Sequence, residues 1–245
     1  MKSMSKILLA VAILAGSVYS YAIPTPTVKV HVNEIVDRHL SGFNAVNVAG
    51  SFDVKIAQTG AESVNIDAPA EVMDHILTEV NNGVLKIYNK HDNWNWGDWW
   101  GHHKKIIIYV TVKNINSVYI SGSGDVAFKD GLAANSLKLK ISGSGDMSGK
   151  IDVKMLESSI TGSGDMTLSG RAESSTVDLV GSGDYTAAKL LTVSTAVRLS
   201  GSGDAEVNAS DKIDAALHGS GDIHYTGAAH NVSSSKTGSG DISRF

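Results

Sequence analysis

The 245-residue sequence has no cysteine, only three prolines and 6% aromatic residues, and its one long apolar run lies at the N-terminus. Without cysteine the chain forms neither a disulfide framework nor a lipid-modified N-terminal cysteine. A chain of this length can instead be stabilised by its own hydrophobic core. Its formal charge of −4 argues against nucleic acid or an anionic membrane as a partner.

The first 22 residues are typical of an export signal. Lys2 and Lys6 form a basic start, Ile7–Leu14 is almost wholly apolar, and Ser20-Tyr21-Ala22 places small residues where a signal peptidase requires them. The apolar segment is too short to span a bilayer. We therefore expect a soluble mature chain with a formal charge of −6, exported to the periplasm, the cell surface or the medium.

The tetrad Gly-Ser-Gly-Asp occurs seven times at intervals of 18 to 21 residues. Its aspartates are Asp125, Asp146, Asp165, Asp184, Asp204, Asp222 and Asp241. Apolar and polar residues alternate on both sides of each tetrad, which predicts strands, and the fixed period predicts a solenoid. The sequence therefore predicts an all-β, single-stranded parallel β-helix with coils of about 19 residues.

The chain reads as one continuous domain after its signal. A lead-in at 23–39 precedes a degenerate β-helix half at 40–113, and 114–245 forms the tetrad-containing half. In the last tetrad copy Lys236 takes an inward position that is apolar in the other copies. An inward charge at the end of a sheet blocks further strand addition, so this copy is expected to be a cap.

Three local patterns mark the degenerate half. Val46–Ile56 copies the repeat with Phe52 in place of the second glycine. Asn81-Asn82-Gly83 predicts a tight hairpin, and Pro69–Ile76 has room for one helical turn.

The order of these segments resembles one known family, the "putative auto-transporter adhesin, head GIN domain" family. The resemblance covers most of 40–245 and is carried by Phe43–Gly60, Asn82–Ile87, Ile108–Val112 and the tetrad series. It implies an exported, right-handed β-helix that is called an adhesin by association and whose biochemical function is unknown. It implies no catalytic residues.

The seven aspartates have a structural and a functional interpretation. Glycine permits backbone angles that a corner requires, and Asp and Ser side chains fix turns by bonding to backbone amides. Stacked in register, the carboxylates would lie about 4.8 Å apart. Neighbours would then repel by about 3.5 kcal/mol at an effective dielectric of 20. Amide hydrogen bonds, raised pKa values or bound calcium could offset this repulsion, and we favour turn formation over calcium binding.

All four tryptophans, Trp94, Trp96, Trp99 and Trp100, lie in the loop 91–105 between two expected strands. Exposed aromatic clusters often mark binding surfaces, and flat indoles stack on sugars, so this loop is a candidate glycan-binding site. The equally weighted alternative is that the rings fold back and cap the β-helix.

Histidines and aspartates of the same loop are a weaker candidate for a zinc or copper site, because their spacing fits no ligand signature. They are His91, Asp92, Asp98, His102 and His103. His218 and His224 fall on outward positions of the repeat and are expected to be surface substitutions.

We expect a binding protein and not an enzyme, because catalysis needs a unique cluster and these carboxylates repeat identically in each copy. The predicted function is adhesion or recognition of a glycan or cell-surface component. The alternatives are a structural envelope protein, with a calcium-binding or purely turn-forming tetrad row, and a polysaccharide-active enzyme.

Overall fold

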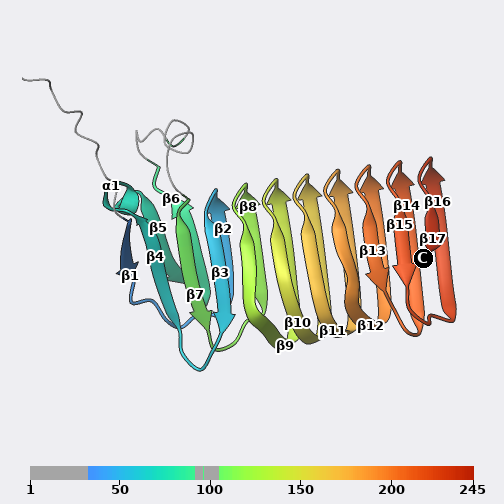
Figure 1. Ribbon diagram of the computed structural model, residues 1–245, viewed down its shortest axis with the longest axis horizontal. Coiled ribbons are helices and arrows are strands. Elements are labelled where there is room, and N and C mark those ends of the chain that lie inside the picture. The colour runs from blue at the N-terminus through green and yellow to red at the C-terminus, as the bar shows by residue number, and fades with distance from the viewer. Residues whose placement is uncertain (1–32, 92–95, 97–104) are drawn as a thin grey trace, which may run out of the picture. The chain divides into compact units, whose positions relative to one another are not determined.

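The computed structural model describes residues 33–91, 96 and 105–245. The expected signal at 1–22 and most of the expected lead-in lie outside the described residues. Of the described residues 71% are in strands and 2% in helices, and stacked coils of about 19 residues form a β-solenoid of about seven turns (Figure 1). The predicted fold class is therefore confirmed.

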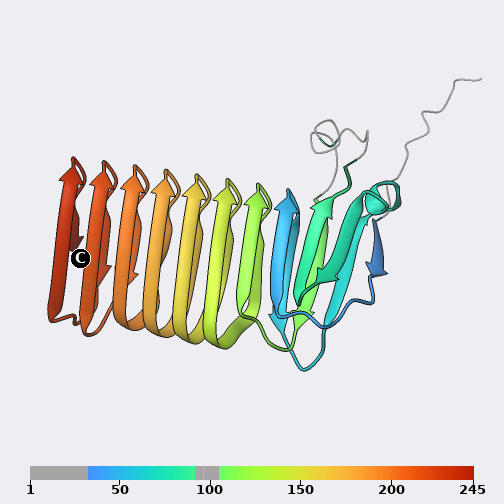
Figure 2. The same ribbon diagram turned by 180° about the vertical axis from the view of Figure 1, so that it is seen from behind.

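The tetrad-containing part is a stack of parallel strands in register (Figures 1 and 2). Its strands are β8 (Ser117–Gly122), β9 (Val126–Gly143), β10 (Met147–Gly162), β11 (Met166–Gly181), β12 (Tyr185–Gly201), β13 (Ala205–Asn208), β14 (Lys212–Gly219), β15 (Ile223–Thr226), β16 (Asn231–Gly238) and β17 (Ile242–Arg244). Each strand from β9 to β12 begins directly after a tetrad aspartate and ends at the first glycine of the next tetrad. One such strand therefore makes one coil.

The second corner of the coils β9 to β12 differs from the sequence expectation. The repeat predicts a second turn between two strands, whereas β9 to β12 continue around this corner as single strands of 16 to 18 residues. Backbone pairing with the neighbouring coils persists through the bend, with register shifts between Gly149 and Ile151 and between Thr167 and Ser169. In these four coils only the tetrad corner interrupts the strand, whereas the last two coils are also interrupted at the second corner, at 209–211 and 227–230.

The degenerate half contains two coils whose spatial order differs from their sequence order. β2 (Ala45–Gly50) pairs with both β6 (Val84–Asn89) and β8, and β3 (Asp53–Gln58) pairs with both β7 (Ile107–Val112) and β9. The first coil in the sequence therefore lies between the second coil and the tetrad stack. Val46–Ile56 is a copy of the repeat, as predicted, since it aligns in register with β8 and β9.

Antiparallel strands cover the N-terminal end of this part, a departure from the simple solenoid that the sequence predicts. They are β1 (Asn33–Asp37) against β4 (Ser63–Pro69), β4 against β7, and β5 (Ile76–Asn81) against β6. The predicted hairpin at Asn81-Asn82-Gly83 joins β5 to β6, with positive φ at Asn82 and Gly83. The predicted helical turn is α1 (Ala70–Met73).

Alternation places one side chain in two inside the stack, where Ile, Leu and Val form a continuous buried core. The last coil is different, because all eight residues of β16 are exposed. Lys236 is paired in register with the buried Leu217, yet its own side chain remains 45% exposed. Apart from Val232 the exposed residues of β16 are polar or small, so this coil presents little apolar surface.

The hydroxyl group of Tyr185 lies inside this core. Tyr185 is 1% exposed, and neither its hydroxyl nor that of buried Ser158 makes a hydrogen bond of ordinary geometry within the described residues. Burial raises the pKa of Tyr185, and the nearby Ser158 and Ser175 hydroxyls oppose part of this rise.

We expect Tyr185→Phe to leave stability unchanged or to raise it by up to about 1 kcal/mol at neutral pH, because it removes a poorly bonded buried hydroxyl. The folded-state pKa of Tyr185 is raised. The protonated hydroxyl therefore contributes fully to the free energy of unfolding below the ordinary pKa of 10.0, and this contribution is lost as pH rises above that value. Urea unfolding of both proteins at neutral and alkaline pH measures this. If the variant gains no stability relative to the parent when the pH is raised from neutral to alkaline, the expectation is wrong.

Candidate functional site

The tetrad corners stack closely, and each of the two glycines in a tetrad is required for a different structural reason. The first glycine of every tetrad has positive φ, as Gly162 does at +128°, and its carbonyl accepts amides from the next coil. The second glycine has no such φ. A Cβ at Gly164 would lie 2.1 Å from the carbonyl oxygen of Gly145, so backbone stacking and not turn geometry excludes a side chain there.

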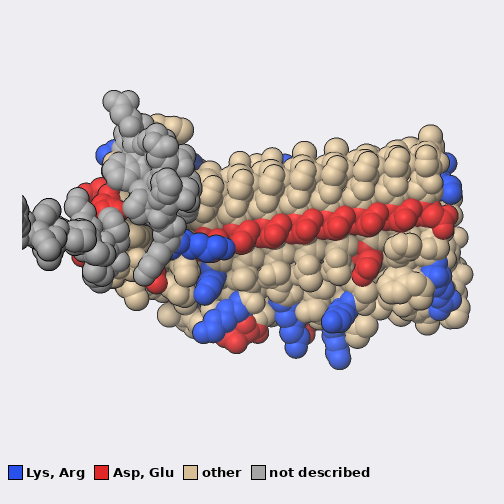
Figure 3. Space-filling model, turned by 45° about the horizontal axis from the view of Figure 1, so that its top comes forward, with Lys and Arg blue, Asp and Glu red and all other residues tan. Residues whose placement is uncertain are grey.

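The carboxylates of the tetrads form a hydrogen-bonded row. Oδ1 of each tetrad aspartate from Asp125 to Asp222 accepts the backbone N–H of the tetrad aspartate in the next coil, as Asp165 does from Asp184 at 2.8 Å. The other five bonds are 2.6 to 3.3 Å long. Figure 3 shows the resulting aspartate row as an unbroken acidic line across the coils. Amide hydrogen bonds are one of the three effects that could offset the repulsion between stacked carboxylates. In the structure these bonds stabilise the neighbouring negative charges.

A lysine lies at each end of the aspartate row. Lys105 Nζ lies 3.0 Å from Asp53 Oδ2 and 3.9 Å from Asp125 Oδ2, and these contacts raise the pKa of Lys105. At the other end Lys236 Nζ lies 3.5 Å from Asp241 Oδ1, the position where a following coil would donate its amide. The cap expected at Lys236 thus also supplies a partner for the final carboxylate.

Calcium at the aspartate row stays a prediction. Within the described residues, no group of three or more His, Cys, Asp or Glu side chains is arranged to hold a metal ion. Each carboxylate from Asp125 to Asp222 already uses one oxygen for a backbone amide.

We expect Asp165→Asn to preserve stability and Asp165→Ala to lower it by about 1 kcal/mol, since only asparagine keeps an oxygen that accepts the Asp184 amide. Thermal melts of both variants and the parent, in chelator and in millimolar calcium, measure this. A calcium-dependent rise that both substitutions abolish would show that the row binds the cation. Equal losses for the two variants would show that the charge, and not the acceptor, stabilises the corner.

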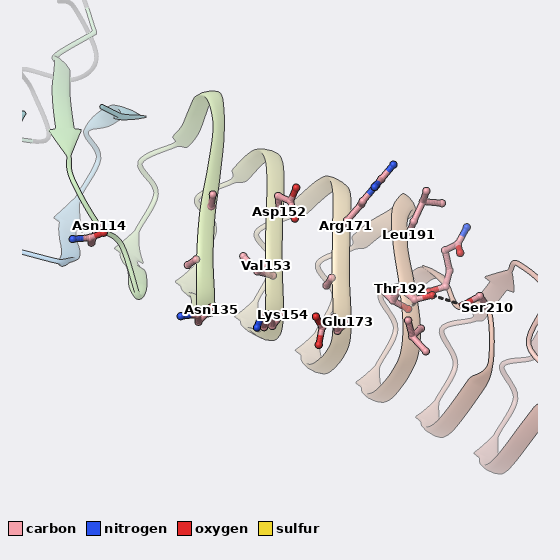
Figure 4. A pocket seen from close by; sticks show the side chains of 15 residues that line it. Asn114, Asn135, Asp152, Val153, Lys154, Arg171, Glu173, Leu191, Thr192 and Ser210 are labelled. Carbon is pink, nitrogen blue, oxygen red and sulfur yellow. Dashed lines mark hydrogen bonds between the residues drawn. The ribbon is translucent and has the colours of Figure 1, made fainter. Parts of the chain in front are cut away.

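The corner opposite the tetrads holds a groove of about 890 Å³ across coils β9 to β12 (Figure 4). We call it the corner groove. Its floor is buried Val153, Ala172 and Thr192, which lie in register with one another. Exposed residues on either side of each floor residue form its two walls.

The walls carry charges of alternating sign. Asp152 and Arg171 occupy paired positions of neighbouring coils on one wall, and Lys154 and Glu173 lie on the same two coils on the other (Figure 4). The two coils β10 and β11 therefore each present one acid and one base, in opposite order. In the part of the chain that the structure describes, no ion pair or hydrogen bond joins these four side chains. Their polar atoms are thus available to a ligand.

Sequence reasoning missed the corner groove. Its residues in β9 to β12 lie six to ten positions after a tetrad aspartate, where the repeat varies from copy to copy. The signal that could have found it is the reversal from Asp-Val-Lys to Arg-Ala-Glu at equivalent positions of successive copies. In the next coil the same positions are Leu191 and Val193, both about half exposed, so the groove becomes apolar there.

The structure describes only one of the four candidate tryptophans. Trp96 packs against the core, with its ring centroid 6.2 Å from Phe52 and 6.5 Å from His75, both edge-on. This is the position that the capping alternative predicts for Trp96. The other three, Trp94, Trp99 and Trp100, lie outside the described residues, as do Asp92, Asp98, His102 and His103 of the candidate transition-metal site.

The two repeat histidines lie on the outside of the sixth copy. His218 is exposed, and His224 is half-buried with Nδ1 3.0 Å from Ser243 Oγ and its ring edge-on to Phe245. Among the described residues, no helix is long and apolar enough to cross a membrane.

Comparisons with known proteins agree with this architecture. Residues 42–229 match the family model described as "Putative auto-transporter adhesin, head GIN domain". No curated protein matches the chain.

Solved structures share the fold over almost their whole length. A "putative adhesin" from Bacteroides fragilis NCTC 9343 is 25% identical, with a TM-score of 0.80 over 87% of this chain and 97% of that one. Two proteins from Parabacteroides distasonis ATCC 8503 share the same coverage. One is called a "putative adhesin" (24% identical, TM-score 0.70) and the other a "Putative lipid binding protein" (23% identical, TM-score 0.68). Because the family model covers most of the solenoid, the chain belongs to the auto-transporter adhesin, head GIN domain family.

Proposed function

We propose that this chain is an exported, non-enzymatic adhesion protein that binds a cell-surface component through the corner groove. Membership in an adhesin family favours an exported or surface location and a binding function. The fold alone does not assign a function, so the proposal depends on the chemistry of the groove.

The observation that carries the proposal is the contrast between the two corners. At the tetrad corner the aspartates are identical in every copy and bond to backbone amides, as scaffold residues do. At the opposite corner the side chains differ from coil to coil and line a concave surface. Solenoids commonly bind partners on extended concave surfaces, with variable side chains on a constant scaffold.

The loop 91–105 remains a second candidate contact on sequence grounds alone. Trp99 and Trp100 are the residues to change there, because Trp96 already packs on the core.

Adhesion of the fluorescently labelled exported chain to isolated cell envelopes tests the proposal. We expect saturable binding that weakens at least tenfold in the double variant Asp152→Ala/Arg171→Ala. The matched control is Asp178→Ala/Arg198→Ala, which removes an exposed Asp–Arg pair of 3.6 Å between neighbouring coils outside the groove. Loss only in a Trp99→Ala/Trp100→Ala variant would move the contact to the loop, and no binding by the parent chain would contradict adhesion.

A further inference from the structure

The corner groove runs along the solenoid axis, so its ligand must cross successive coils. Val153 pairs in register with Ala134 on one side and with Ala172 on the other, and Ala172 pairs with Thr192. The backbone of the floor is therefore already in the sheet and presents no free strand edge. This groove therefore does not offer strand addition, the mode of peptide recognition that main-chain hydrogen bonds drive.

Side chains of the walls must then provide the recognition. Asp152 and Glu173 accept hydrogen bonds, whereas Lys154 and Arg171 donate them, and the four formal charges sum to zero. A ligand with a net charge of either sign meets as much repulsion as attraction in this arrangement. A hydroxyl group instead both donates and accepts, so neighbouring hydroxyls can satisfy an acid and a base of the same coil.

The remaining surfaces of the groove fit the same chemistry. The amides of Asn114 and Asn135, which each donate and accept, lie at one end. The small apolar floor of Val153 and Ala172 offers contact to the carbon–hydrogen faces of a ring without a deep side-chain pocket. No aromatic residue lines the groove within the described residues, so hydrogen bonds from the walls of β10 and β11, and not ring stacking, would orient the ligand.

We infer that the corner groove binds a neutral carbohydrate chain laid along the solenoid axis. This inference rests on the proposed function, because it names the ligand class of the same site. The ligand's hydroxyls bond to the acid and base that β10 and β11 each present, in two neighbouring coils about 4.8 Å apart.

A second copy of this chain is the competing occupant. Under a twofold rotation each acid of the alternating pattern faces a base of the partner copy, so the pattern is complementary to itself. Two concave grooves placed face to face would leave a channel between them, which favours the carbohydrate. Light scattering over a range of protein concentrations distinguishes the two occupants.

The experiment titrates the exported chain with dextran, mannan and maltoheptaose as neutral probes, and with heparin and chitosan as charged ones. Calorimetry measures affinity, and amide NMR shifts locate the site. We expect a neutral probe to bind with little salt dependence, to shift amides of the floor, and to lose at least tenfold affinity in Asp152→Ala/Arg171→Ala. The Asp178→Ala/Arg198→Ala control should bind like the parent and should unfold, like the groove variant, at the parent midpoint.

Each contrary outcome overturns the inference. Binding only to heparin or chitosan, with steep salt dependence, would show a charged ligand. If the double variant in the groove still binds a neutral probe as the parent does, the carbohydrate site lies elsewhere. If the parent forms dimers and this variant does not, a second copy of the chain occupies the groove. If no probe binds while envelope adhesion persists, the carbohydrate inference fails and the adhesion function stands. If adhesion is absent too, both fail.

Discussion

Replacing Gly164 with alanine should lower the free energy of unfolding by about 3 kcal/mol or more, at the upper end of overpacking costs. The backbone angles at this position do not exclude a side chain. The added methyl would lie 2.1 Å from the Gly145 carbonyl oxygen and 3.1 Å from its carbon and nitrogen. Backbone atoms held in the sheet cannot move aside as a flexible side chain can, so adjacent coils must separate at this corner.

Urea unfolding of the variant and parent, followed by far-ultraviolet circular dichroism, measures this loss. Gly60→Ala is the matched control, because Gly60 has ordinary backbone angles and its added Cβ meets nothing within 4 Å. The control should unfold within about 0.5 kcal/mol of the parent, as surface substitutions usually do. A loss at Gly164 no larger than that at Gly60 would show that the coils are not stacked this closely.

Replacing Phe52 with alanine should lower the free energy of unfolding by about 3 to 5 kcal/mol, the range for phenylalanine truncated in a packed core. Phe52 is fully buried and packs edge-on against Trp96. Phe52 stands at the position of the second tetrad glycine. Comparison with the other repeat copies alone would therefore predict that a small residue is tolerated there. The neighbouring coil β6–β7 contains no tetrad, and the described residue of its corner segment that contacts the Phe52 ring is Trp96.

Urea unfolding measures this effect, and tryptophan emission reports on the surroundings of Trp96. Phe245→Ala is the control, because Phe245 is 62% exposed and contacts only the half-buried His224 ring among aromatic groups in the described part of the chain. A Phe52→Ala protein as stable as the Phe245→Ala protein would show that the corner of the β2–β3 coil is not anchored by this ring.

Much of the fold was predictable because each coil repeats a local pattern. Alternating residues such as Ile141 and Met147 identify inward positions in any strand, and a 19-residue period leaves few arrangements besides a solenoid. The spatial order of the N-terminal coils was not predictable. The β2–β3 segment pairs with β6–β7 and with β8–β9 through strand edges that its own residues do not specify.

The candidate sites show the same division. The row of carboxylates followed from in-register stacking, but the amide that each Oδ1 accepts belongs to the next coil and became evident only from the three-dimensional arrangement. The corner groove was missed because Asp152 and Arg171 are far apart in sequence and meet only through the register of β10 and β11.

The sequence by itself determined an all-β repeat, its period, the inward face of each coil and a polar final copy, because these depend on residue type and spacing along the chain. The tertiary structure decided which coil lies beside which, why the second tetrad glycine excludes a side chain, and where unlike charges gather into a groove. These features arise from contacts between coils about 19 residues apart. Stacking distance and register set such contacts, and no single copy of the repeat contains them.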